Sequence, residues 1–315
     1  MSIAVNTVTS ADGTQIAFER LGNDEPIIMF GGATCDRAMM RPDAEAVAQH
    51  ATVINYDRRG RGGSSDVTPY AIQREIEDIA ALVDEVGGAA CLYGHSSGAA
   101  LVLHAAAQDL PITAFVLHEP PYSPPTEAAD RDARAYAARL EALLAADDRP
   151  GAAALFMGTV GMPPEAVEQM RGEPWFANTA AIAHTLAYDS EIMGDRTGGT
   201  VPGDLVTSAT APALVIRGGA SPDWMIAIGR QFGRRPSARA VRPPRRPGSQ
   251  PGSRRARTGA RRVPRDDRRR APRLRGAGEP SRTLTAGPTN SRLVQPVFAL
   301  VAAAANAAMV GNSWS

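Results

Sequence analysis

The sequence predicts an α/β fold in which helices flank a mostly parallel central sheet. Short apolar runs that suit buried strands alternate with longer stretches whose apolar residues recur at helical spacing. The segment 94–98, Gly-His-Ser-Ser-Gly, stands between one such strand and one such helix. The chain has 315 residues, of which 43% are hydrophobic, enough for one large α/β domain with a helical cap.

The pattern of residues 1–88 predicts four strands and two helices. The strands are 5–10, 14–19, 26–30 and 52–56, and the helices are 37–48 and 72–86. Asp12-Gly13 is a typical hairpin turn, so the first two strands are expected to pair with each other. Gly87-Gly88 is expected to end the second helix. The glycine-rich turn at 57–64 lacks the lysine of a P-loop and the spacing of a dinucleotide fingerprint, so phosphate binding is not expected.

Residues 94–98 have the pattern of a nucleophile elbow, because they follow an apolar strand at 89–93 and precede an apolar helix at 99–107. In such a turn glycine is needed at both ends, since a side chain there would meet the neighbouring strand or helix. We therefore predict that Ser96 is a nucleophile. Its backbone is expected to be strained, with the hydroxyl at the N-terminus of the next helix. The alternative is a structural turn without a chemical role.

A loop of small residues, Gly-Gly-Ala-Thr at 31–34, follows the strand at 26–30. Such a loop leaves a backbone N–H free to face the nucleophile. We expect the first amide of an oxyanion hole to be that of Gly32 or Ala33, with Gly32 as our assignment, and the second to be that of Ser97. The alternative is a glycine loop with no role.

Three motifs together resemble the α/β-hydrolase family. They are the Gly-Gly loop after one strand, Tyr-Asp-Arg-Arg-Gly-Arg-Gly-Gly-Ser at 56–64 after the next, and Gly-His-Ser-Ser-Gly after the third. They occur in the family's order with suitable spacing, and the resemblance covers residues 5–231. It implies acyl-transfer chemistry on a small-molecule substrate, usually ester or amide hydrolysis, without a cofactor. It also implies a helical cap after the strand that ends near Leu117.

On this basis a hydrolase domain is predicted over 1–232. Its core is 1–122 and 201–232, its cap is 123–200, and the cap helices are expected at 128–144, 165–170 and 179–188. Strands are expected on either side of the cap, at 112–117 and 212–216. Methionine and aromatic residues in the cap suit a lid over an acyl or aromatic substrate, or else simply pack as helical core.

Two carboxylates are candidates for the acid of a serine–histidine–acid site. The resemblance implies an acid in the loop after strand 212–216, where Asp223 lies two residues beyond the directly aligned Ser221. Glu119, just past the strand before the cap, has an alternative placement that the fold tolerates. Both remain open, and either could instead be a solvated loop carboxylate.

The histidine base is missing from its usual place. The family's order is nucleophile, acid, histidine, yet the last of the five histidines is His184. His118 could approach the site from its strand end, whereas His95 is expected to turn away from Ser96 and His104 to pack in its helix. Because an unassisted serine is a poor nucleophile at neutral pH, we predict an impaired hydrolase. The alternative is a protein of this fold that binds a small ligand without catalysis.

The segment 233–292 differs in composition from the rest of the chain. It holds 19 of the 34 basic residues, all arginine, and 3 of the 33 acidic ones, so its net charge is +16 and that of the remainder is −15. It shows no apolar periodicity and no strand, which predicts a disordered tail rich in Arg, Pro and Gly.

Our hypothesis for this tail is a reading frame shifted near Phe232, because GC-rich codons read out of frame encode these residues. A frame moved by one base permits a last strand and a histidine across 242–250. The competing hypothesis, a basic arm that binds nucleic acid, is disfavoured because no aromatic residue lies in 233–292 to stack on bases.

The remaining features set expectations about the protein's surroundings. Residues 293–315 form an Ala-rich C-terminal segment, and 293–310 within it are only a weak membrane candidate, because alanine contributes little to insertion. Cys35 and Cys91 are too few for a disulfide framework and suit no metal site, and the N-terminus lacks the features of a signal peptide. We therefore expect a cytoplasmic protein with no metal, no cofactor and no nucleic-acid or membrane partner.

Overall fold

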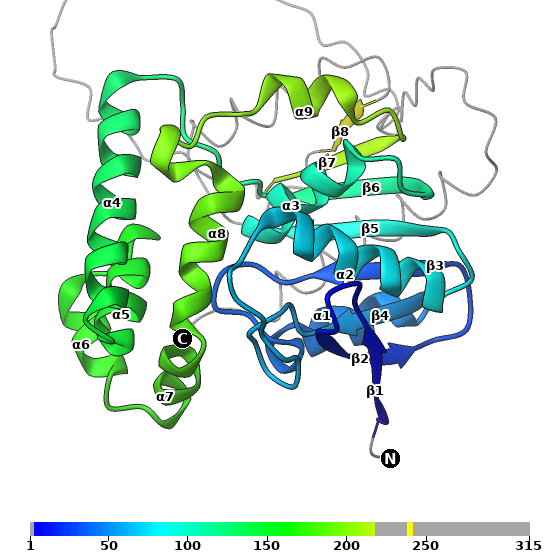
Figure 1. Ribbon diagram of the computed structural model, residues 1–315, viewed down its shortest axis with the longest axis horizontal. Coiled ribbons are helices and arrows are strands. Elements are labelled where there is room, and N and C mark those ends of the chain that lie inside the picture. Colours follow the sequence, from blue (N-terminus) through cyan, green and yellow to red (C-terminus); the bar gives the residue numbers. More distant parts are fainter. Residues whose placement is uncertain (1–2, 218–237, 242–315) are drawn as a thin grey trace, which may run out of the picture. The chain divides into compact units, whose positions relative to one another are not determined.

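An eight-stranded sheet organises the part of the chain that the computed structural model describes, residues 3–217 and 238–241 (Figure 1). Its strands are β1 (Val5–Thr9), β2 (Gln15–Leu21), β3 (Pro26–Phe30), β4 (Thr52–Tyr56), β5 (Ala90–His95), β6 (Ile112–His118), β7 (Ala213–Ile216) and β8 (Ala238–Val241). They lie in the order β1-β2-β4-β3-β5-β6-β7-β8. The pairs β1–β2 and β2–β4 are antiparallel, and the other pairs are parallel. The prediction of a mostly parallel sheet is confirmed.

Helices pack on the sheet, and a further group lies between β6 and β7 in the sequence. The helices before β6 are α1 (Arg37–Ala48), α2 (Ile72–Glu85) and α3 (Ser97–Ala106). Those after it are α4 (Glu127–Ala145), α5 (Arg149–Thr159), α6 (Pro164–Met170), α7 (Pro174–Ala181), α8 (Leu186–Met193) and α9 (Gly203–Ser208), with short 3₁₀ turns η1 (Ala183–Thr185) and η2 (Asp195–Thr197). In Figure 1 the green helices α4–α7 stand apart from the sheet, and α8, which contacts both α3 and α4, lies between. This group is the predicted helical cap. No helix in the described residues is both long and apolar enough to cross a membrane.

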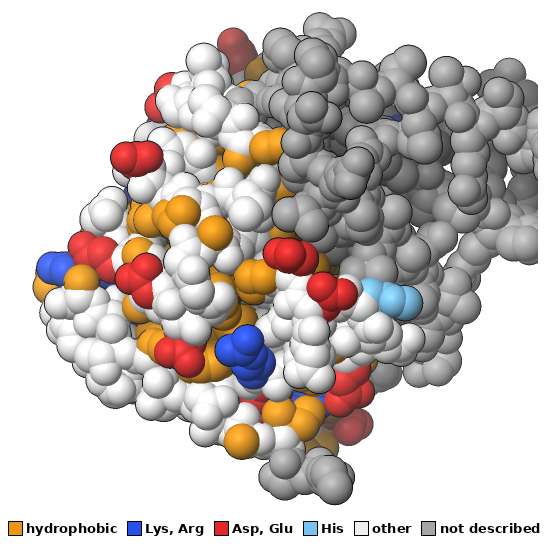
Figure 2. Space-filling view, turned by 90° about the vertical axis from the view of Figure 1, so that its right-hand side faces the viewer, with side chains coloured by type: hydrophobic (Ala, Val, Ile, Leu, Met, Phe, Trp, Pro, Cys, Tyr) orange, Lys and Arg blue, Asp and Glu red, His pale blue; other side chains and the backbone are white. Residues whose placement is uncertain are grey.

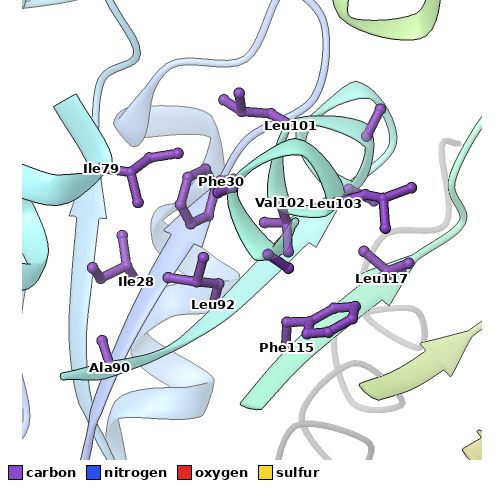
Figure 3. Packing of buried hydrophobic residues seen from close by; sticks show 14 of the residues in the cluster. Ile28, Phe30, Ile79, Ala90, Leu92, Leu101, Val102, Leu103, Phe115 and Leu117 are labelled. Atoms are coloured by element: carbon purple, nitrogen blue, oxygen red, sulfur yellow. The ribbon is translucent and has the colours of Figure 1, made fainter. Parts of the chain in front are cut away.

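Apolar clusters on both faces of the sheet explain why its central strands read as continuous apolar runs. In β3, Ile28 and Phe30 belong to the cluster that α2 and α3 cover, whereas Ile27 and Met29 belong to the cluster that α1 covers. Figure 3 shows part of the first cluster, in which side chains of β3, β5 and β6 lie near Val102 and Leu103 of α3, while Leu101 lies on the side of α3 away from these strands. A strand that is buried on both faces must be apolar at successive positions.

Helix α3 is buried on nearly every side, as its uniformly apolar sequence predicts. All of its residues except His104 are buried, and it contacts the sheet, α2, α8 and α9. The Nε2 atom of His104 lies 2.9 Å from the carbonyl oxygen of Ile192 in α8. His104 is therefore a packed histidine that joins α3 to the cap.

The face of the described residues in Figure 2 carries more acidic than basic side chains. On the face in Figure 2, Asp and Glu side chains are spread among white and orange atoms, with few basic groups between them. This distribution agrees with the net charge of −15 that the sequence carries outside residues 233–292. The basic residues that the fold does contain include three arginines that are almost fully buried, Arg58, Arg59 and Arg61.

The cap differs from the prediction in its last helix. We expected one helix over 179–188, but α7 ends at Ala181 and α8 begins at Leu186, with η1 between them. The Thr185 hydroxyl donates to the carbonyl of Ile182 at 2.8 Å, a local bond that competes with a continuous helix. The break lets α8 pack against α3, so tertiary packing overrides local helical preference here.

Helix α5 was not predicted, although its start carries a recognisable signal. The Asp148 carboxylate accepts a hydrogen bond from the amide of Gly151 at 2.8 Å, and Pro150 stands in the first helical turn. Both are typical of a helix N-terminus. The glycines at 151 and 158 obscured the helical pattern that follows.

A strand occurs where none was expected. The backbone of β8, within the segment 233–292, pairs in parallel with β7 from Ala213↔Ala238 to Ile216↔Val241. The expectation that this segment holds no strand was wrong at these four positions, because the open edge of β7 offers unpaired backbone groups that a short, unremarkable stretch can use. The rest of the segment, Phe232 and residues 293–315 lie outside the described residues.

A buried carboxylate lies just after α8. Asp195 in η2 is 7% exposed, and burial, with a further contribution from the nearby Asp189 carboxylate, raises its pKa to about 6. The charged form is thus disfavoured in the folded protein. Between pH 3.8 and about 6 the folded state therefore binds more protons than the unfolded state, and stability falls as pH rises through this window.

We predict that Asp195→Asn reduces this loss of stability. The difference in unfolding free energy between the variant and the wild type should grow between pH 4 and 7, by up to about 3 kcal/mol. Urea denaturation at several pH values measures it. Asp147→Asn, at an exposed position, is the control and should follow the wild type. Parallel pH profiles for Asp195→Asn and the wild type would contradict the prediction.

Candidate active site

Ser96 occupies a sharp turn between β5 and α3. Its φ is 55° and its ψ is −125°, a conformation that residues with a side chain rarely adopt. Its amide donates to the carbonyl of His118 in β6 at 2.9 Å, and its own carbonyl accepts from the amide of Ala99 at 2.8 Å. Such a conformation costs about 1–3 kcal/mol and persists only where surrounding bonds hold it.

Glycines on both sides of Ser96 allow this turn to form. A Cβ built on Gly94 would overlap the carbonyl oxygen of Gly98, and one built on Gly98 would overlap the carbonyl oxygen of Phe30. The close packing of β3, β5 and α3 therefore excludes a side chain at either position, which confirms the reason given for the two glycines.

The loop after β3 lies directly against the Ser96 side chain. A Cβ built on Gly32 would lie 2.9 Å from the Ser96 Cβ and 3.5 Å from its Oγ. Ser97 is the first residue of α3, so its amide has no acceptor within the helix. The two backbone segments that the sequence analysis selected thus flank the hydroxyl.

A buried carboxylate on the cap, Asp189 of α8, connects α3 to the loop after β4. Asp189 Oδ1 accepts from Ser97 Oγ at 2.8 Å and from Arg58 Nη1 at 2.6 Å, and its Oδ2 accepts from Arg61 Nη2 at 2.8 Å. None of these four residues is more than 2% exposed. Burial alone would raise the pKa of Asp189, but the charges of Arg61 and Arg58 outweigh it and hold the pKa below its ordinary value.

The same network extends to α2 and to the loop after β3. Arg58 Nε and Nη2 donate to the two oxygens of Glu75 at 2.8 and 2.6 Å. Arg61 Nη1 donates to the carbonyl oxygens of Gly32 at 2.6 Å and Cys35 at 3.2 Å. Two arginines and two carboxylates balance in charge, and each carboxylate accepts from an arginine, as a buried ionic network requires. The glycine-rich turn at 57–64, which carries both arginines, was recognised in the sequence, but neither carboxylate was.

Of the two candidate acids, Glu119 lies beside the turn. It follows His118, whose carbonyl holds the Ser96 amide, and its own amide donates to the carbonyl of Ile216 in β7 at 2.8 Å. Its φ is 49°, a positive value for a non-glycine residue, as at Ser96 and at Thr34 in the loop after β3. Asp223 and the neighbouring Ser221 lie outside the described residues.

His118, whose carbonyl accepts from the Ser96 amide, has a side chain that is engaged elsewhere. His118 Nδ1 lies 2.6 Å from the Tyr93 hydroxyl, and the rings of His118 and His95 are 5.1 Å apart. Burial, together with the charge of His95, lowers the pKa of His118 to about 3, and burial lowers the pKa of His95 as well. An imidazole with so little affinity for a proton is a poor general base.

The remaining histidines either have other contacts or are exposed. His184 Nε2 lies 3.4 Å from Asp66 Oδ2, His104 is bonded to α8, and His50 is exposed beyond the end of α1. No hydrogen bond joins an imidazole to the Ser96 hydroxyl within residues 3–217, which include all five histidines. The described residues also contain no group of three or more His, Cys, Asp or Glu side chains that could hold a metal ion.

The chain belongs to the alpha/beta hydrolase family, whose model matches residues 30–249. It is similar to an alpha/beta hydrolase from Sphaerobacter thermophilus, with 45% identity, coverage of 78% of this chain and 95% of that chain, and a TM-score of 0.68. A hydrolase from Pseudomonas aeruginosa is 25% identical over 76% of this chain and 90% of that one, with a TM-score of 0.60. A thermophilic esterase from Thermogutta terrifontis shares the fold, at 24% identity, 76% and 89% coverage and a TM-score of 0.54. The predicted fold and family are confirmed, and the family supports a hydrolase-type function.

We predict that Gly94→Ala strongly destabilises the protein, because the added methyl group meets backbone atoms that cannot rotate away. The expected loss of unfolding free energy is about 3 kcal/mol, measured by urea denaturation. Gly158→Ala is the matched control, since nothing lies within 4 Å of a Cβ at this exposed position of α5. It should stabilise the protein by up to about 1 kcal/mol through helix propensity. Equal stability of the Gly94 variant and the wild type would show that the turn is looser than described.

Proposed function

We propose that the protein is a serine hydrolase that acts on a small ester-like substrate with Ser96 as its nucleophile. The observation that supports this most directly is the position of Ser96. Its backbone is held at positive φ at the start of α3, and the Gly32 backbone lies against its side chain. This arrangement combines the hydroxyl of a half-buried serine with backbone amides and a helix N-terminus, which together favour a developing negative charge.

In the proposed reaction Ser96 Oγ attacks the carbonyl carbon of the ester and loses its proton to a base. The carbonyl oxygen gains the electron pair and accepts hydrogen bonds from the amide of Ser97 and that of Gly32 or Ala33. The tetrahedral species then expels the alcohol, which takes up a proton, and an acyl-serine remains. Water attacks this ester in the same way, releases the acid and restores the hydroxyl.

Glu119 and Asp223 are proposed as alternative acids of the site. A carboxylate in such a site orients the base and stabilises its protonated form, so it must lie close to the nucleophile. The position of Glu119, one residue beyond the carbonyl that holds the Ser96 amide, supports the first candidate. The resemblance of the loop after β7 to the family pattern supports the second.

We propose that proton transfer limits the activity of this chain. His118, His104 and His184 are engaged with Tyr93, Ile192 and Asp66. His95 lies against the His118 ring, His50 is exposed, and the sequence has no histidine after His184. Removing the base of a serine–histidine pair lowers kcat by roughly 10⁶-fold, although the oxyanion hole and binding retain roughly 10³- to 10⁴-fold catalysis over water. Slow turnover of activated esters is therefore expected.

The acyl group of the substrate is proposed to be apolar. Ala33, in the loop that lies against Ser96, packs in one cluster with Met157, Phe176 and Leu186 of the cap. Apolar side chains of the cap thus pack beside Ala33, and an apolar acyl group would complement them.

A second candidate function is non-catalytic binding of a small ligand. It is favoured by one observation, the absence of an imidazole bonded to Ser96 in the described residues. In this case the elbow and the cap would persist as a binding site while the chemistry is lost.

We predict that a fluorophosphonate probe labels Ser96, and that added imidazole accelerates both labelling and hydrolysis of p-nitrophenyl acetate by supplying the missing base. Mass spectrometry of peptides locates the label. Ser96→Ala should lose the label and the protein-dependent part of the imidazole effect, whereas Ser208→Ala, an exposed serine on α9, should keep both. Subtracting the Ser96→Ala rate removes hydrolysis by imidazole itself.

Two outcomes would count against the hydrolase. Label at another residue would contradict the assignment of Ser96. Absence of both label and turnover, even with imidazole, in a folded protein that binds ester analogues would favour the non-catalytic binder instead.

A further inference from the structure

We propose that Asp189, on the cap helix α8, is a positioning residue that holds the two oxyanion-donor segments in place. This inference rests on the proposed function of Ser96 and deepens it. Asp189 does not lie in any motif of the sequence, and it reaches the elbow from a helix of the cap.

The first contact acts on Ser97 directly. Ser97 carries the amide proposed as one donor, and its hydroxyl donates to Asp189 Oδ1 at 2.8 Å. Because Ser97 follows the strained Ser96, fixing its side chain also limits rotation of the peptide between the two residues. That peptide contains the Ser97 N–H.

The second contact acts through Arg61 on the loop after β3. Arg61 Nη2 donates to Asp189 Oδ2 at 2.8 Å, and its Nη1 donates to the carbonyl oxygen of Gly32 at 2.6 Å. A trans peptide is planar, and its C=O and N–H point in opposite directions. Holding the Gly32 carbonyl toward Arg61 therefore directs the Ala33 N–H away from Arg61, so this contact favours Ala33 over Gly32 as the loop donor.

Arg61 can join these two groups because its guanidinium is a planar fork with separate N–H groups. A lysine at this position would keep the charge but could not bond the carboxylate and the carbonyl in the same fixed geometry. Arg58 binds the other oxygen of Asp189 and is itself held by both oxygens of Glu75. Each Asp189 oxygen thus accepts from a guanidinium that also donates elsewhere, Arg58 to Glu75 and Arg61 to the Gly32 carbonyl.

Positioning and simple electrostatics predict opposite effects of removing the charge of Asp189. A carboxylate near the oxyanion disfavours the negative charge that develops there, so Asp189→Asn should accelerate the reaction if electrostatics alone mattered. If Asp189 positions the donors, the same change should slow it, because a displaced donor no longer meets the oxyanion. The sign of the change therefore separates the two accounts.

The test compares Asp189→Asn with Asp78→Asn. Asp78 is a matched control, because it is also 1% exposed and accepts from Arg59 Nε and Nη2 at 2.9 and 2.7 Å. Its partner Arg59 bonds to Asp12 and to the carbonyl of Arg74, rather than to Gly32 or Ser97. Both variants lose a buried carboxylate that pairs with arginine, Asp189 with Arg58 and Arg61 and Asp78 with Arg59. Only Asp189→Asn loses contacts to the donor segments.

We predict that Asp189→Asn lowers the rate constant for labelling of Ser96 by a fluorophosphonate, and kcat for p-nitrophenyl acetate with imidazole, by about 100-fold. KM should change little, since the donors act in the transition state. Asp78→Asn should keep the wild-type values at a temperature where both are folded by circular dichroism. Ser97→Ala should lose part of the rate, and Arg61→Lys should resemble Asp189→Asn rather than the wild type.

A second readout does not depend on activity. Amide hydrogen exchange by mass spectrometry should be faster over residues 31–36 and 97–100 in Asp189→Asn than in the wild type, and unchanged there in Asp78→Asn. If the wild type is not labelled, the proposed function fails, and the exchange pattern alone decides whether Asp189 holds these segments.

The positioning role would be overturned if Asp189→Asn were labelled with the same rate constant as the wild type and its amide hydrogen exchange were unchanged. A faster reaction of Asp189→Asn would overturn it as well. If Asp189→Asn does not fold, Ser97→Ala and Arg61→Lys decide in its place. Both variants reacting at the wild-type rate would overturn the proposal.

Discussion

The shared carboxylate of Asp189, bonded to Arg58, Arg61 and Ser97, is the interaction on which the arrangement of the site depends. It ties the cap helix α8 to the start of α3 and, through Arg61, to the loop after β3. Removing one partner of a buried ionic network leaves an uncompensated charge and costs about 3–5 kcal/mol. The cap helix is therefore part of the scaffold of the elbow at this point. A lid that moved α8 away from α3 would have to break these bonds.

The scaffold and the proton chemistry come from different parts of the chain. Backbone groups of β3, β5, β6 and α3, all before residue 123, form the elbow and the loop beside Ser96. The family pattern takes the base from the region beyond the last strand, where this sequence has no histidine. Preorganised amides and the general base contribute separately to catalysis, so the first can persist without the second. This separation is why a well-formed elbow and a slow reaction are compatible in our account.

Local patterns were sufficient to predict the core, because each of its elements depends on neighbours in sequence. The hairpin at Asp12-Gly13, the elbow glycines and the helix start at Arg37 follow from turn chemistry, close packing and periodicity. The carboxylates that organise the site could not be predicted this way. Glu75 stands among charged residues of α2 and resembles part of a solvated face, yet it is buried, and Asp189 is buried only because the break before α8 turns that helix toward α3. The sequence did hold one signal, the three arginines in the turn at 57–64. Arginines that are buried need acidic partners nearby. Similarly, β8 depends on the open edge of β7 rather than on its own sequence.

The central claim is that Ser96 and the amides beside it form an acyl-transfer site, and a crystal structure of the protein after reaction with a fluorophosphonate tests it most directly. The account predicts a covalent bond between Ser96 Oγ and phosphorus. It also predicts one phosphonate oxygen about 2.7–3.1 Å from the amide nitrogen of Ser97 and from that of Gly32 or Ala33. An adduct at another residue, or one whose oxygen points away from both amides, would contradict it.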